Sequence, residues 1–146
     1  SMNLFADYGF APTPYTKPPD EDANKAAFEV WQAHGVPSYS LGFQGTTHFD
    51  SSQLPLFPAT SWCPEPASGS CEGGWGQPSI EYYTLAWFDR WLKKPGEPGF
   101  ESADARLIDD AWKGGARRMS FHYDSARDFP DRTGHTQRCE SIREGC

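Results

Sequence analysis

Hydrophobic and polar positions follow three successive patterns in the first third of the chain. Residues 2–6 are a short apolar run typical of a strand. Residues 21–34 follow the helical period, and Gly35 then stands where a helix usually ends. The apolar side of this helix is formed by Ala27, Phe28, Val30 and Trp31. Residues 38–43 return to a strand pattern after Pro37. Strand, helix, tight turn and strand predict an αβ unit whose two strands run parallel.

The rest of the chain is less regular. Residues 51–78 are rich in Pro, Gly and Ser and predict a long loop. A second helix is expected from Ile80 to about Lys93, with Ser79 as its N-cap and Pro95 beyond its end. Its apolar residues cover more than one stripe, so we expect it to be buried on a broad face.

The last third predicts three weaker features. Residues 102–112 favour a short helix, residues 117–123 a strand, and the remainder a charged, Arg-rich tail. We therefore expect an α/β fold with few, mostly parallel strands and flanking helices. Residues 1–115 would form its core, and residues 116–146 the C-terminal strand and tail.

Composition narrows the class of protein. The chain has 146 residues, the size of one ordinary domain, and a net charge of −7. This acidic balance argues against a nucleic-acid or anionic-membrane partner. The mean hydropathy is −0.70, and no apolar run approaches the ~18 residues of a spanning helix. No motif in the sequence calls for a metal or an organic cofactor, and we expect neither.

Four cysteines bear on the cellular compartment. Cys63 and Cys71 lie in the long loop, and Cys139 and Cys146 lie near the C-terminus. Three pairings are possible, of which 63–71 with 139–146 closes the shortest loops. Free thiols and a metal site are the alternatives, although no C-x-x-C motif supports the metal site. Two disulfides would indicate a secreted or periplasmic protein.

His48 is the strongest candidate for chemistry. It follows the predicted strand 38–43 in a Gly-Thr-Thr loop, and functional sites of α/β sheets form at this end of parallel strands. A histidine there can act as a general base, although it can equally be a surface loop residue. Asp7 follows the first strand, so the two side chains would emerge side by side if the strands are neighbours. Asp50 reads as a local turn former.

A nucleophile is not evident in the sequence. The G-x-S-x-G elbow, which joins a strand to a helix, does not occur. Residues 69–73 have this spacing with Cys71 at the centre, but they lie within the Pro- and Gly-rich loop. No oxyanion loop can be recognised either.

Five short segments carry a family resemblance. They are Met2-Asn3-Leu4-Phe5-Ala6-Asp7, Ala11-Pro12, the stretch 28–37, Gly45-Thr46-Thr47-His48-Phe49 and Leu85-Ala86-Trp87-Phe88-Asp89-Arg90-Trp91-Leu92-Lys93. Together they make residues 2–113 resemble the C-terminal part of an α/β-hydrolase. The resemblance is to secreted bacterial esterases and lipases related to dienelactone hydrolases and cutinase-like enzymes.

The resemblance implies a serine carboxylic-ester hydrolase acting on a small-molecule ester. His48 would be the triad histidine and Asp7 the triad acid, although an alignment on Ala11-Pro12 puts Tyr8 at the acid position. The family's N-terminal half, which holds the nucleophile, is not in these residues, so the isolated chain is expected to be inactive. A half sheet exposes an edge and an apolar face, so we expect a homo-oligomer or a second chain to cover them.

Two other functions are compatible with the sequence. An aromatic-rich chain can be a non-catalytic module that binds carbohydrate or a protein, with Trp62 and Trp75 as exposed stacking platforms. Trp31, Trp87 and Trp91 lie at helical spacing and read as core residues. Alternatively, Cys71 or a serine could act with His48 in a small stand-alone enzyme, which a Cys63–Cys71 disulfide would exclude.

Overall fold

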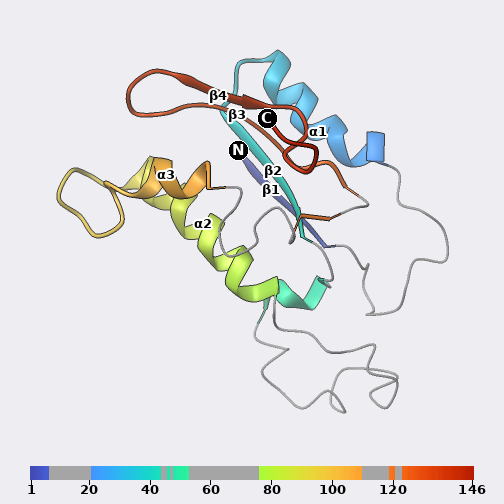
Figure 1. Ribbon diagram of the computed structural model, residues 1–146, viewed down its shortest axis with the longest axis horizontal. Coiled ribbons are helices and arrows are strands. Elements are labelled where there is room, and N and C mark those ends of the chain that lie inside the picture. Colours follow the sequence, from blue (N-terminus) through green and yellow to red (C-terminus); the bar gives the residue numbers. More distant parts are fainter. Residues whose placement is uncertain (7–20, 44–45, 47, 53–75, 110–118, 121–122) are drawn as a thin grey trace, which may run out of the picture.

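The computed structural model describes residues 1–6, 21–43, 46, 48–52, 76–109, 119–120 and 123–146, with only the backbone of 21–24, 48, 49 and 76. These residues form a four-stranded mixed sheet in the order β1-β2-β3-β4. Helix α1 lies on one side of the sheet, and α2 and α3 lie on the other (Figure 1). The arrangement is an α/β fold, as expected in outline.

The first αβ unit is confirmed. Strand β1 (Met2–Ala6) pairs in parallel with β2 (Ser38–Phe43), and helix α1 (Glu21–Ala33) lies between them in sequence. Gly35 adopts a φ of +65° directly after the helix, a conformation that glycine reaches without a steric penalty. This turn brings the chain back into the sheet at Pro37.

Strand β2 is the centre of the core. All six of its residues are buried, and successive side chains point to opposite faces of the sheet. Tyr39, Leu41 and Phe43 belong to the main apolar cluster, together with Tyr83 and Trp87 of α2 (Gly76–Leu92). The Tyr39 and Tyr83 rings meet edge to face with centroids 6.0 Å apart. The opposite face of β2 carries Ser38, Ser40 and Gly42 and looks toward α1.

The two later helices differ from their predicted bounds. Helix α2 begins at Gly76, so Ser79 lies within its first turn and is buried rather than acting as the N-cap. Helix α3 covers only Ala103–Leu107. Its two buried residues, Ala103 and Leu107, account for its packing against α2.

The prediction that the chain ends in a charged tail is wrong. This part of the chain forms two of the four strands of the sheet. Strands β3 (Ala126–Pro130) and β4 (Thr136–Cys139) form a hairpin, and β3 pairs antiparallel with β2. The sheet therefore has one parallel and two antiparallel pairs, and the expectation of mostly parallel strands is also wrong. Within the predicted strand 117–123, the described Met119 makes an isolated bridge to Phe43.

A disulfide closes the end of the chain. Cys139 of β4 is bonded to Cys146, as the local pairing predicts. The loop it closes places Ile142 in the core, with 3% of its surface exposed. The Ile142 amide also donates to the Ser125 carbonyl at 2.6 Å. Cys63 and Cys71 lie outside the described residues.

Candidate functional site

The carboxyl ends of β1 and β2 lie together. Ala6 is the last residue of β1 and pairs with Phe43, the last residue of β2. Asp7 is the next residue after Ala6 but lies outside the described part of the chain. His48 begins the short 3-10 helix η1 (His48–Ser51), whose backbone contacts both β1 and α2. The strands that lead to Asp7 and His48 therefore end side by side, at the same end of the sheet.

Buried polar side chains gather where β2 ends. Four of them are no more than 1% exposed. They are Thr46, Asp50, Ser120 and Ser125. The Thr46 hydroxyl donates to the Phe43 carbonyl at 2.9 Å, and the Ser125 hydroxyl accepts from the Gly42 amide at 3.0 Å. These bonds hold the strand end and the start of the His48 loop in a defined position.

A second segment packs against this end of β2. The Ser120 amide donates to the Gly42 carbonyl at 2.9 Å, and a Cβ placed on Gly42 would lie 2.8 Å from the Tyr123 Cβ. Tyr123 in turn stacks on Phe5 of β1, with ring centroids 5.7 Å apart and planes inclined by 15°. Ser120 and Tyr123 thus fix the two parallel strand ends relative to one another.

The burial of Asp50 cannot be predicted from the sequence. Asp50 does lie in η1, as a turn former would, but its side chain is fully buried. A carboxylate at such a depth is costly unless its oxygens are satisfied. No local signal distinguishes it from an exposed turn residue, because its burial depends on α2, which packs against η1.

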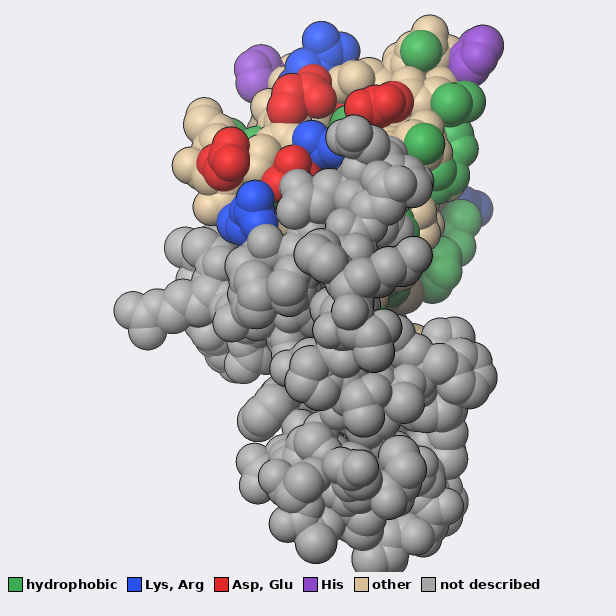
Figure 2. Space-filling view, turned by 90° about the vertical axis from the view of Figure 1, so that its right-hand side faces the viewer, with side chains coloured by type: hydrophobic (Ala, Val, Ile, Leu, Met, Phe, Trp, Pro, Cys, Tyr) green, Lys and Arg blue, Asp and Glu red, His purple; other side chains and the backbone are tan. Residues whose placement is uncertain are grey.

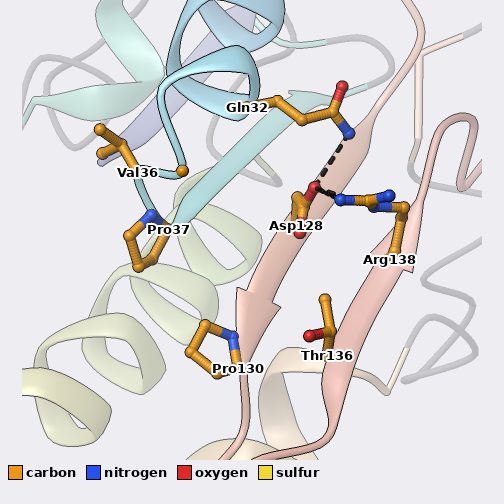
Figure 3. A pocket seen from close by; sticks show the side chains of 8 residues that line it. Gln32, Val36, Pro37, Asp128, Pro130, Thr136 and Arg138 are labelled. Atoms are coloured by element: carbon orange, nitrogen blue, oxygen red, sulfur yellow. Dashed lines mark hydrogen bonds and ion pairs between the residues drawn. The ribbon is translucent and has the colours of Figure 1, made fainter.

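A cavity of about 210 Å³ lies at the opposite end of β2 (Figure 3). Val36, Pro37 and Pro130 line one side of it, and the Asp128 carboxylate lies on the other. Asp128 Oδ2 accepts from Gln32 Nε2 at 3.0 Å and from Arg138 Nε at 2.9 Å. The cavity is therefore remote from the strand ends that carry the candidate pair, and its charged groups already bind one another.

The three tryptophans predicted as core residues differ in burial, and Trp31 of α1 is only partly buried and outside the main apolar cluster. Trp87 is 8% exposed and belongs to the core, as expected. The same expectation is wrong for Trp91, which is 38% exposed and stacks under Arg90 with 4.4 Å between the guanidinium carbon and the ring centroid. Trp62, Trp75 and Cys71 lie outside the described residues, so the binding-module and cysteine-enzyme interpretations stay predictions.

Charges of both signs are interspersed on the surface. Figure 2 shows acidic and basic side chains side by side on the described part of one face, with hydrophobic ones toward its margin. Asp124 pairs with Lys25 at 3.4 Å and with Arg143 at 3.2 Å. Among the described residues, no group of three or more His, Cys, Asp or Glu side chains is arranged to hold a metal ion. The described helices include none long and apolar enough to cross a membrane.

Two carboxylates outside the candidate site have a lowered pKa. Hydrogen bonds from Thr133 and Gln137 lower the pKa of Asp131 to about 2. The Lys93 ammonium, followed by Arg106, lowers the pKa of Asp89 in α2. Both groups hold structural elements together, so neither is a candidate for proton transfer.

Comparison with known proteins returned no match to a family model, a curated protein or a solved structure.

Proposed function

We propose that this chain supplies the histidine and the acid of a serine carboxylic-ester hydrolase. The observation that carries the proposal is the β1–α1–β2 unit, which brings the residue before Asp7 level with the end of the strand that leads to His48. The contact of η1 with β1 supports the same arrangement. Sites of α/β proteins form at this end of parallel strands.

The proposed chemistry assigns a role to each residue. His48 accepts the proton of a serine hydroxyl while the serine oxygen attacks the ester carbonyl. The carbon–oxygen bond to the alcohol breaks, and His48 gives its proton to the departing alcohol. Water then hydrolyses the acyl-serine through the same histidine. Asp7 holds the imidazole in the correct tautomer and stabilises its protonated form.

The nucleophile of the proposed enzyme comes from a segment or chain outside these residues. The sequence has no G-x-S-x-G elbow, and β1 is an edge strand of the described sheet. Further strands of a complete hydrolase would add beside β1, because an edge strand is where a sheet can be extended. Small-molecule esters are the proposed substrates.

The disulfide supports an extracytoplasmic location. Cys139–Cys146 closes a loop that packs into the core, and such bonds persist mainly in oxidising compartments. We infer that the protein is secreted or periplasmic.

A fluorophosphonate probe tests the proposed reaction. The isolated chain should give no covalent adduct by intact-mass spectrometry. The full-length gene product that contains these residues should give one serine adduct, and His48→Asn should abolish it. His34→Asn is the matched control, since His34 is exposed just beyond α1. A His48-dependent adduct on the isolated chain would show that the nucleophile lies within these 146 residues; an adduct on the full-length protein that survives His48→Asn would overturn the proposal.

A further inference from the structure

The cavity of Figure 3 lies where the end of α1 meets the β3–β4 hairpin. Asp128 and Pro130 alternate along β3 with Phe129, which belongs to the apolar core beneath α2. Their side chains therefore point to the other face of the sheet, toward α1. Thr136 and Arg138 of β4 pair with these two residues and share that face. The hairpin is thus the floor of the cavity, and the turn after α1 is its wall.

The apolar surface of the cavity is aliphatic. It consists of Val36 and Pro37 in the wall and Pro130 in the floor. The volume of about 210 Å³ is smaller than the ~300–1,000 Å³ of sites for drug-sized ligands, so the cavity suits a short aliphatic chain. None of the described residues that line it is aromatic, so it lacks the ring faces that recognise quaternary ammonium groups.

The Asp128 carboxylate presents one oxygen to protein donors and keeps the other apart. Gln32 Nε2 and Arg138 Nε and Nη2 all lie 2.8–3.0 Å from Oδ2. Figure 3 shows the dashed contacts meeting at this one oxygen. No donor from the described part of the chain reaches Oδ1, although the Asp128 side chain is only 12% exposed. A carboxylate oxygen with so little access to water is stabilised by a donor.

Thr136 places a second oxygen on the same floor. Its hydroxyl makes no hydrogen bond to any residue that the structure describes, and Figure 3 shows it on the side toward Pro130. Asp128 and Thr136 are diagonal neighbours in the β3–β4 ladder, so their side chains face the same space. Both oxygens can accept hydrogen bonds, which favours a ligand that donates them.

The charges around the cavity favour a cation. Asp128 and Arg138 neutralise one another, and the Glu140 carboxylate accepts from Gln32 Nε2 at 3.0 Å. Helix α1 has no basic residue in its last turn, so the negative end of its dipole is not offset there. Two cations bind backbone carbonyls of lining residues from outside the cavity. They are Arg90 of α2, at Pro130, and the Ser1 ammonium, at Pro37.

We propose that this cavity binds the terminal ammonium group of an aliphatic amine, supplied by a free alkylamine or by a lysine side chain. The ammonium donates to Asp128 Oδ1 and to the Thr136 hydroxyl, and its methylene chain packs against Val36, Pro37 and Pro130. An anion would instead meet the carboxylate and the negative end of α1. The site lies away from the strand ends of the proposed hydrolase and does not depend on that function.

A titration of the ¹⁵N-labelled chain with n-butylammonium tests the site by NMR. The amide signals of Gly35, Val36 and Thr136 should shift and saturate. Butyrate and n-butyltrimethylammonium should cause no such shifts, because one is an anion and the other has no N–H donor. Nα-acetyl-lysine methylamide distinguishes the sources, since equally tight binding indicates a lysine side chain and weaker binding a free amine. Saturation by neither amine, or equal binding of the trimethyl derivative, would overturn the proposal.

Two variants test the assigned oxygens. Asp128→Asn should weaken n-butylammonium binding by about ten- to a hundredfold, and Thr136→Val by about two- to tenfold. Asp124→Asn is the matched control, because Asp124 pairs with Lys25 and Arg143 and does not line the cavity. It should leave the dissociation constant unchanged. Thr136 is exposed, so its variant keeps the test available if Asp128→Asn fails to fold. Wild-type affinity in the Thr136 variant, or in a folded Asp128 variant, would contradict the assignment.

Discussion

Gly42 lies where residues 119–120 and 123–125 pack across the end of β2, and a residue without a side chain leaves room for them there. A methyl group there would lie 2.8 Å from the Tyr123 Cβ and 3.3 Å from the Ser120 Cβ. We expect Gly42→Ala to destabilise the fold by about 1–3 kcal/mol, because the crossing backbone must shift. Gly42→Val should cost more. Urea denaturation measures both, and an unchanged midpoint for the valine variant would show that the crossing is not tight.

Asp131 gives the fold a measurable acid dependence. Its carboxylate accepts hydrogen bonds from the Thr133 hydroxyl, the Gln137 amide and the His135 backbone amide, and its pKa falls from 3.8 to about 2. A pKa lowered by folding stabilises the protein above the unfolded value. This stability should be complete above about pH 4 and lost as the pH falls toward 2. Between these pH values, Asp131→Asn should make the urea midpoint less dependent on pH. If the midpoint falls equally with pH in the variant and the wild type, Asp131 is not the group responsible.

Single residues also show the limit of prediction from sequence. The sequence places His48 and Asp7 after two neighbouring parallel strands, because strand, helix and turn signals are local. It does not reveal that Asp50 is fully buried. That burial arises from packing between η1 and α2, which are separated by a long loop.

Among the elements, the β3–β4 hairpin is not evident from the sequence for a similar reason. Arg127 and Asp128 interrupt the apolar pattern of β3, and charges at these positions favour a solvated tail. In the structure, Asp128 lies opposite Arg138 of β4 and pairs with it at 2.8 Å. Partners of this kind come from the second strand, so inspection of the first strand alone does not reveal them.

The loop of the same hairpin stabilises the C-terminal end of α2. The Arg132 guanidinium donates to the carbonyls of Asp89 and Arg90 at 3.0 and 3.2 Å and lies 3.6 Å from the Phe100 ring centroid. Arg132→Met should cost about 1–3 kcal/mol, since these helix-end carbonyls lose a charged donor. Arg138→Met is the control, because the Arg138 side chain is 60% exposed, and it should cost less. Equal destabilisation in thermal melts would contradict the role of Arg132.

At the scale of the whole molecule, the C-terminal disulfide secures a core residue. Cys139 and Cys146 are 7 residues apart in sequence, and the loop between them places Ile142 in the same apolar cluster as Phe129 of β3. Replacing both cysteines by serine should cost about 2–3 kcal/mol, as expected for a short closed loop. Urea unfolding of the variant and the wild type measures this difference. A variant as stable as the wild type would show that the loop holds its position without the covalent bond.

The whole fold was predictable in class but not in topology. The α/β organisation follows from local signals, whereas the antiparallel half depends on contacts between distant segments. Helix α2 shows a further gap, since its apolar residues predict burial on a broad face, whereas Leu85, Phe88 and Leu92 are exposed.

The central claim is that Asp7 and His48 lie side by side, and an NMR titration of the histidine imidazoles tests it most directly. If Asp7 contacts His48, Asp7→Asn should lower the pKa of His48, because a neighbouring carboxylate favours the protonated ring. The titrations of His34 and His135 should not change. An unchanged His48 titration in Asp7→Asn would contradict the account, since the two residues would then not form the proposed pair.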